Sequence, residues 1–194
     1  MSATSSLQFL DDRRSVPSRQ LGEPGPDPAT LRRMLQSAVR VPDHGKLVPF
    51  RFLHITGPAR LALGEVLAER TLARDPDAPA AVVEKDRARF SHAPDIVTVI
   101  ARLTPGHKVP EQEQLLSAGS ACFALLQAAQ ALGFGAQWLT GWMAYDGEVA
   151  RRLGLAANER IVGFIHIGTP RMEAPERERP DAAALLSEWR PDGR

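Results

Sequence analysis

The chain has 194 residues, 43% of them hydrophobic and 24% charged, which is typical of a globular protein and excludes a disordered or fibrous one. Its length allows one domain with a hydrophobic core of its own, and Cys122, the only cysteine, excludes an intramolecular disulfide. The net charge of +1 excludes a broad basic surface for nucleic acid, so any anion site has to be local.

The N-terminus is polar and lacks the apolar core of a signal peptide. The most apolar stretches are interrupted by Gly, Gln, Arg or Asp before they reach membrane-spanning length. A single cysteine also suits a reducing compartment. We therefore expect a cytoplasmic protein that acts without membrane or nucleic acid as a partner.

The first clear element is a helix after a loop. Residues 16–29 are rich in Pro and Gly and are expected to be irregular. Asp27 can cap a helix that begins with Pro28, and Pro42 marks its end because a residue before proline avoids the helical conformation. The expected apolar face consists of Leu31, Met34, Leu35, Ala38 and Val39.

Strand and helix signals follow in turn. Aromatic and β-branched residues predict a strand at 50–56, and a buried strand is predicted at 95–101. Between them, residues 57–73 and 81–91 are expected to form helices, joined by a surface loop or lid at 74–80.

The segment 111–135 predicts a long helix that Gly133 and Gly135 terminate. Its middle is apolar or small on nearly every side, which predicts burial on every side. In a chain this short, such a helix indicates a core that a partner subunit completes. The small residues are Ala118, Gly119, Ser120, Ala121, Ala124, Ala128 and Ala129.

A short strand at 136–141, a helix at 146–155 and a strand at 160–168 are expected next. The rest is a charged, Pro-rich tail that ends in a short amphipathic piece around Leu185, Leu186 and Trp189. This order of elements predicts an α+β fold with a central mixed or mostly antiparallel sheet.

Several kinds of chemistry have no motif here. The sequence contains neither the G-x-S-x-G of a nucleophile elbow nor a phosphate-binding P-loop. None of the histidines has zinc-ligand spacing, so no metal site is predicted. The "GFGAQW" at 133–138 follows a helix and lacks the third glycine of a dinucleotide loop. Cys122 lies among apolar residues and is interpreted as a buried, inert thiol.

Two polar clusters remain. Arg13, Arg14 and Ser15 form either a solvated face or an anion site, in which a guanidinium grips phosphate oxygens and the hydroxyl adds a donor. The loop at 40–52 is dense in polar groups and is either a charged surface loop or part of the same site. Its charged residues are Arg40, Asp43, His44, Lys46 and Arg51.

Spaced motifs together resemble the FMN-dependent nitroreductase family, and most of all its short bacterial YdjA-like branch. The resemblance runs from Phe9 to Met172. It implies an intertwined α+β homodimer of nitroreductase-like fold, with FMN sites at the interface, one domain at 1–172 and a tail at 173–194. The motifs are "RRS" (13–15), "RVPDHGKLVPFRF" (40–52), "HKVP" (107–110) leading into "SAG" (117–119), "GFGAQW" (133–138) and "IVGFIHIGTP" (161–170).

The resemblance also implies site residues. The family's phosphate-gripping motif falls on Arg13, Arg14 and Ser15. Its flavin contacts from the partner subunit fall on Arg40 and His44. Further cofactor contacts are implied at Trp138, Leu139, Thr140 and Arg171.

Positive charge at the pyrimidine edge of a flavin stabilises the reduced ring, and Lys46 or Arg40 is expected to supply it. The nicotinamide-dinucleotide segment of the family falls on residues 128–133, which core packing explains as well. Two departures are evident: "PDHGK" replaces the Ser and Asn that many members carry, and Leu139 has no side-chain donor.

The resemblance implies an oxidoreductase that passes hydride from NAD(P)H through bound FMN to a small oxidising substrate such as a nitroaromatic or quinone, by a ping-pong mechanism. The cofactor carries this chemistry, so no catalytic side chain is expected. Alternatives are a dehalogenase or enoate-type reductase on the same scaffold, a non-catalytic FMN-binding protein, and a dimeric interaction module without cofactor.

Overall fold

A five-stranded antiparallel sheet is the centre of the computed structural model, which describes residues 3–191. The strand order is β1-β5-β3-β2, and β4 pairs with β5 as well. Every pairing is antiparallel, which decides between the mixed and the antiparallel sheet that the sequence left open. The strands are β1 (Leu21–Gly22), β2 (Phe50–Thr56), β3 (Asp95–Arg102), β4 (Gly135–Leu139) and β5 (Glu159–Pro170).

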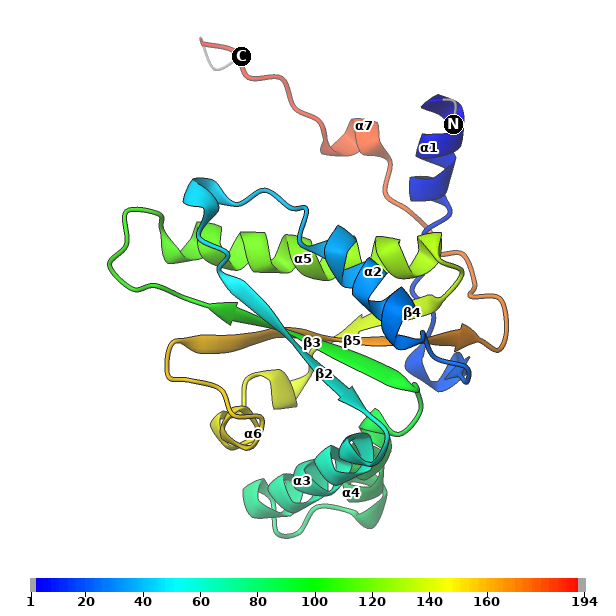
Figure 1. Cartoon of the computed structure of the whole chain (residues 1–194), viewed down its shortest axis with the longest axis vertical. Helices are drawn as coiled ribbons and strands as arrows, with labels where there is room; N and C mark the ends of the chain where they lie inside the picture. Colours follow the sequence, from blue (N-terminus) through cyan, green and yellow to red (C-terminus); the bar gives the residue numbers. More distant parts are fainter. Residues whose placement is uncertain (1–2, 192–194) are drawn as a thin grey trace.

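Helices cover both faces of this sheet (Figure 1). One face carries α2 (Pro28–Ala38) and α5 (Glu111–Ala131), and the other carries α3 (Pro58–Arg74), α4 (Ala80–Arg87) and α6 (Gly147–Arg152). A hydrophobic cluster fills the space on each side. The 3-10 turns are η1 (Ser18–Gln20), η2 (His44–Lys46), η3 (Ala88–Phe90) and η4 (Trp142–Ala144).

The predicted start of α2 is confirmed. The Asp27 carboxylate accepts hydrogen bonds from the backbone N–H groups of Ala29 and Thr30, at 2.8 and 2.9 Å, which confirms the predicted cap. The prediction that Val39 belongs to the apolar face is wrong: the helix ends at Ala38, and Val39 is half exposed.

Two short elements were not predicted. A helix, α1 (Ala3–Asp11), precedes the arginine pair, and β1 lies within the stretch expected to be irregular. Leu21 and Gly22 pair with Pro170 and Thr169, so β5 extends beyond the predicted end at residue 168. A strand of two residues has no periodicity to detect, and only its partner strand creates it.

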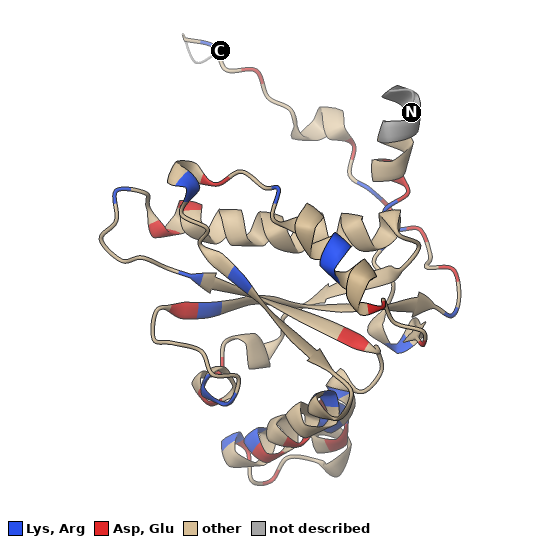
Figure 2. Ribbon diagram, viewed as in Figure 1, with Lys and Arg blue, Asp and Glu red and all other residues tan. Residues whose placement is uncertain are grey.

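The expectation that the 111–135 segment is buried on all sides holds for one side of α5 only. Ala118, Ala121 and Leu125 are buried against the sheet, whereas Leu116 and Phe123 are 62% and 46% exposed. Figure 2 shows α5 almost without charged residues beyond its first turn. The single chain therefore leaves an apolar face of this helix open to solvent.

The C-terminal tail extends away from the sheet beside α1 (Figure 1). It contains the short helix α7 (Ala182–Leu185), and Leu185, Leu186 and Trp189 are 73%, 82% and 83% exposed. Among residues 3–191, the amphipathic piece thus buries its large apolar side chains against no other element. Within residues 3–191, no helix combines the length and the apolar character needed to cross a bilayer.

Candidate functional site

A pocket of about 430 Å³ lies where the end of α1, the middle of α5 and the end of β4 meet. It brings together Arg13, Ser15, Trp138 and Thr140, which are far apart in the sequence and which the sequence analysis assigned to one cofactor site. Apolar side chains of α5, which the sequence did not indicate, complete it. The lining residues are Arg13, Ser15, Phe123, Leu126, Trp138 and Thr140.

The segment after α1 is held beside β4 by hydrogen bonds. The backbone N–H of Val16 donates to the carbonyl of Ala136 at 3.1 Å, and the N–H of Ser18 donates to Gln137 Oε1 at 2.6 Å. These bonds place Arg13 and Ser15 next to the strand that carries Trp138. The motif near the N-terminus and the motif near residue 138 therefore form one site.

Trp138 owes its position to a glycine in the neighbouring strand. Its indole Nε1 donates to the carbonyl of Val162 at 3.2 Å, and a Cβ atom at Gly163 would collide with the ring. The indole can therefore lie flat over β5, and 36% of the residue stays exposed as a wall of the pocket.

Arg13 has no ion-pair partner among the described residues. Burial, with the nearby positive charges of Arg179, Arg14 and Arg177, lowers the pKa of its guanidinium. Its Nη1 points to Ser15 Oγ at 3.4 Å. Several guanidinium groups thus lie near Arg13, and Arg13 itself pairs with no carboxylate among the described residues, which favours binding of an anion there.

The Arg14 side chain does not line the pocket and contacts the C-terminal tail instead. Its guanidinium donates to the carbonyl of Asp11 at 2.7 Å and forms an ion pair with Glu176. Arg179 also pairs with Glu176, at 3.1 Å. The sequence "PERERP" was interpreted only as part of a charged tail. No pattern in this segment indicates that Arg177 and Arg179 return to the N-terminal arginines, which is a contact of the tertiary structure.

Leu139 and Arg171 lie outside the pocket lining. Leu139 follows Trp138 in β4, and successive side chains of a strand point to opposite faces. The Arg171 side chain lies against Gly22, and its backbone N–H donates to the carbonyl of Gln20 at 2.8 Å.

The structure places Arg40, His44 and Lys46 at the other end of α5. The His44 Nδ1 atom lies 2.7 Å from Glu113 Oε2. Because Glu113 and Phe123 are ten positions apart on one helix, this loop is about 15 Å along α5 from the pocket of its own chain. Arg40, His44 and Lys46 therefore do not line the pocket of their own chain.

The loop that carries them has an unusual backbone. Lys46 and Val48 have φ angles of 54° and 49°, in the left-handed region that side chains disfavour, above all β-branched ones. The Asp43 carboxylate holds this conformation by accepting from the N–H groups of Leu47 and Val48, at 3.1 and 2.8 Å. Strain of this kind persists where function requires a shape.

Arg51, the last polar residue of this cluster, has a structural partner. Its guanidinium donates to both carboxylate oxygens of Glu159, at 2.6 and 2.8 Å, and links the outer strand β2 to β5. The hydrogen bond from Arg51 lowers the pKa of Glu159 to about 2. Arg51 is therefore not available to a ligand.

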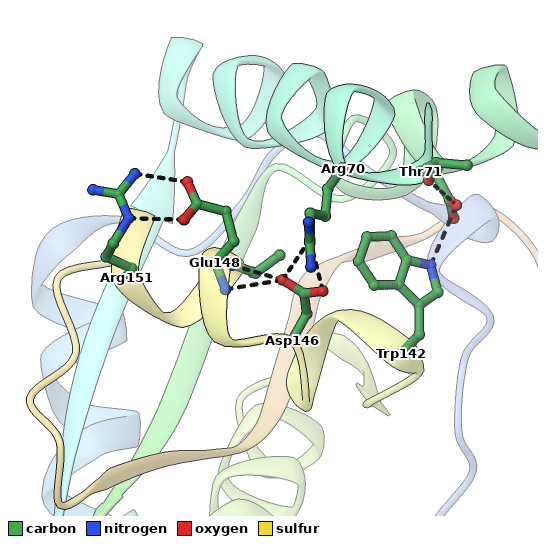
Figure 3. Close-up of polar contacts among 8 residues, drawn as sticks. Arg70, Thr71, Trp142, Asp146, Glu148 and Arg151 are labelled. Carbon is green, nitrogen blue, oxygen red and sulfur yellow. Dashed lines mark hydrogen bonds and ion pairs between the residues drawn. The ribbon is translucent and has the colours of Figure 1, made fainter. Parts of the chain in front are cut away.

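The chain beyond Thr140 is anchored to α3 and α4 (Figure 3). Trp142 donates through Nε1 to Asp86 at 3.2 Å, and Asp86 also accepts from the Thr71 hydroxyl at 2.8 Å. Next to it, Arg70 donates to both oxygens of Asp146, at 3.0 and 2.8 Å. These bonds fix the segment that follows the pocket residue Thr140.

Cys122 is fully buried, and burial raises the pKa of its thiol to about 12. The predicted burial of this thiol is therefore confirmed. It lies next to the pocket residue Phe123 but belongs to the core on the sheet side of α5.

The fold and the pocket together define an α+β protein with a crevice that has Arg13 and Ser15 at one end and apolar side chains at the other. The open face of α5 forms part of this crevice.

The chain belongs to the nitroreductase family, whose model matches residues 10–169. It is 37% identical over 169 residues to YdjA of Escherichia coli, an NAD(P)H nitroreductase by name, covering 87% of this chain and 90% of that protein. It is 34% identical over 183 residues to an NAD(P)H nitroreductase, again by name, of Haemophilus influenzae, covering 89% and 92% of the two chains. The membership predicted from the motifs is confirmed, and the protein is an oxidoreductase of the nitroreductase type.

Solved structures agree on the fold. A nitroreductase-like protein from Bacillus cereus superposes with a TM-score of 0.80 at 23% identity, covering 97% of this chain and 98% of that one. A Desulfovibrio desulfuricans nitroreductase in complex with FMN superposes with a TM-score of 0.73 at 24% identity, covering 95% and 97%.

Proposed function

We propose that the pocket binds FMN and that the protein passes hydride from NAD(P)H, through FMN, to a small oxidising substrate such as a nitroaromatic or a quinone. The observation that carries the proposal is the meeting of Arg13 and Ser15 with Trp138 and Thr140 in one pocket. The family of the chain and the FMN complex of the Desulfovibrio relative support the same cofactor.

The polar end of the pocket fits a phosphate monoester. Such a group carries two negative charges and accepts several hydrogen bonds, and Arg13 is a partly buried cation without a counterion. Ser15 supplies a hydroxyl donor. Arg177 and Arg179 add positive charge from the tail, and we favour them over Arg171 because Arg13 is within their electrostatic reach.

The apolar end fits a flavin ring. Trp138, Phe123 and Leu126 form flat or apolar walls, which suit a large aromatic ligand with polar edges. The Thr140 hydroxyl is a polar group at the rim. Leu139 takes part through its backbone only.

When bound, FMN supplies the hydride chemistry, and the residues of this chain bind it, orient it and keep one face open to substrates in turn. An open face would allow a ping-pong order, in which NAD(P)H gives up its hydride and leaves as NAD(P)+ before the oxidant enters. We assign the positive charge beside the pyrimidine edge to the partner's loop after α2, through Lys46 or Arg40. The site is therefore complete only in a homodimer built on the exposed face of α5.

The test is the visible spectrum of the purified protein and the binding constant of FMN for the double variant R13A/S15A. Wild type should carry FMN, and NAD(P)H should bleach its absorption near about 450 nm when oxygen is absent. A hydrogen bond from a charged group contributes about 1.5–3 kcal/mol, so the double variant should bind FMN at least about tenfold more weakly. R151A is the matched control, since Arg151 pairs with Glu148 on the surface, away from the pocket.

A protein that lacks flavin and gains none on reconstitution would exclude this function and favour the interaction module. FMN that is bound but not bleached by NAD(P)H would instead limit the protein to flavin binding.

A further inference from the structure

A second cavity, of about 650 Å³, lies between α2, the end of β2 and the start of α3. It shares no lining residue with the pocket at Arg13. Its size is within the usual range for small-molecule sites. Its apolar walls are Pro24, Pro26, Pro28, Leu31, Leu35 and Pro94.

The walls of this cavity are pre-formed. Proline rings have a fixed φ and lose no rotamer entropy when a ligand packs on them. Gly25 closes one side by approaching the Asp95 carboxylate so closely that a Cβ atom would collide with it. A rigid slot with apolar walls suits a flat, apolar ligand body.

The negative groups of the cavity are already engaged. Asp95, only 7% exposed, lies 2.7 Å from His54 Nε2 through Oδ1, so the imidazole is held in one orientation at the wall. Glu23 accepts from the N–H of Gly25 at 3.1 Å. Neither carboxylate pairs with an arginine among the residues that the structure describes.

The two arginines of the cavity form no ion pair with a carboxylate among the described residues. Arg32, which is exposed, takes part in no ion pair or side-chain hydrogen bond within the described part of the chain. Arg60 donates through Nη1 to the carbonyls of Ser91 and Ala93, and its buried Nε atom has no partner. The cavity therefore combines apolar walls with two arginines, neither of which forms an ion pair among the described residues, beside the carboxylates of Glu23 and Asp95.

We propose that this cavity is a second ligand site, for a small aromatic carboxylic acid. The ring lies between the proline and leucine walls, and the carboxylate faces Arg32 and Arg60, with His54 as a further hydrogen-bonding group. The site is independent of the FMN pocket, because the two cavities are lined by different elements and residues.

The test is calorimetric titration of the full-length, FMN-loaded protein with 2-naphthoate, with 2-naphthalenemethanol as the uncharged probe of the same shape. The acid should bind with one site per chain, and the alcohol should bind about tenfold more weakly, because it loses the charge-assisted contact. Absorption of the bound flavin reports separately that the FMN site is intact.

Variants locate the site. R32Q should weaken binding of 2-naphthoate about tenfold. R33Q, the neighbouring control, should leave it unchanged, because Arg33 donates to Ser37 Oγ at 2.6 Å and does not line the cavity. T56W, which fills the cavity with an indole, should abolish binding. Arg60 is unsuitable for substitution because its backbone contacts support the fold.

Absence of binding to the wild-type protein would overturn the proposal. Equal loss in R32Q and R33Q, or loss in R13A with retention in R32Q and T56W, would also overturn it, since the acid would then bind elsewhere. These outcomes are distinct from failure of the flavin function, which the visible spectrum reports.

Discussion

Trp138 can lie over β5 because residue 163 has no side chain. A Cβ atom there would meet the indole, whereas the indole in its present position contributes a wall of the pocket that we propose for FMN. A residue that never touches the ligand thus determines the shape of the site.

We expect G163A to displace the Trp138 ring and to weaken FMN binding about tenfold, the loss of roughly one good aromatic contact. The measurement is FMN dissociation followed by flavin fluorescence, and Trp138 displacement should also change the near-ultraviolet circular dichroism. G147A is the control, since a Cβ at Gly147 meets no atom within 4 Å. Unchanged affinity in G163A would mean that Trp138 is not a wall of the site.

His166 is a buried residue that makes the stability of the protein depend on pH. It is fully buried in β5, stacks on Phe90 with ring centroids 5.6 Å apart, and neither ring nitrogen has a hydrogen-bond partner. Burial, with the nearby charges of His92, Arg89 and Arg60, lowers its pKa to about 3.

Stability should therefore fall as the pH falls. Below about pH 6.5 His166 takes up a proton in the unfolded chain, whereas in the folded protein it stays neutral until about pH 3. Lowering the pH through this window therefore stabilises the unfolded state relative to the folded state. Between about pH 7 and pH 5 the free energy of unfolding should drop by about 2 kcal/mol from this residue. Burial of His92 lowers its pKa and adds a loss of the same sign.

Urea denaturation at both pH values, at one protein concentration, measures the drop. H166F keeps the stacking on Phe90 and removes the titration, so its drop should be smaller than that of wild type. An equal drop in the two proteins would contradict the assignment to His166.

At the scale of elements, the loop after α2 has a strained backbone, which lowers the stability of the folded state. Its left-handed residues, Lys46 and Val48, are held by the Asp43 carboxylate through the N–H groups of Leu47 and Val48. An element held in this way can present Lys46 and His44 to a partner subunit without further ordering.

D43A should release the loop, lower the free energy of unfolding by about 1 kcal/mol and reduce turnover of the FMN-loaded protein. Thermal unfolding and steady-state kinetics measure the two effects. D75A removes a similar bond, from Asp75 to the N–H of Asp77 at 3.2 Å, in a loop far from the site, and should leave turnover unchanged. Equal turnover in all three proteins would separate the loop from function.

Element identity followed from local chemistry in much of the chain. The strand predicted at 50–56 is β2 to the residue, because aromatic and β-branched residues favour it and turn residues bound it. The cap at Asp27 was equally local. In contrast, β1 forms only because β5 pairs with it, and a pattern of two residues is too short to predict a strand.

At the scale of the molecule, α5 presents an apolar face to solvent in the single chain. Leu116 and Phe123 are exposed there, and Phe123 also lines the pocket. If a second copy covers this face, the loops after α2 come within reach of the opposite pockets, which is the arrangement that we propose.

F123E places a charge in that interface, and burial of an unpaired charge is costly, so the variant should be monomeric and should lose FMN. Analytical ultracentrifugation and the visible spectrum measure the two changes. L61E is the control, because Leu61 is 57% exposed on α3, away from α5. A dimer that persists in F123E would show that the interface lies elsewhere.

The sequence by itself determined the helices and strands with strong caps or periodicity, the family, and the residue types suited to an anion and a flat ring. These depend on neighbours along the chain. The tertiary structure alone decided that Arg13 faces Trp138, that Arg177 and Arg179 return to the N-terminus, and that Arg51 is neutralised by Glu159, 108 residues away. These contacts join segments that are distant in the sequence, so they depend on how the strands pair and where the tail packs, and a register shift of one residue would turn every side chain of a strand to the opposite face.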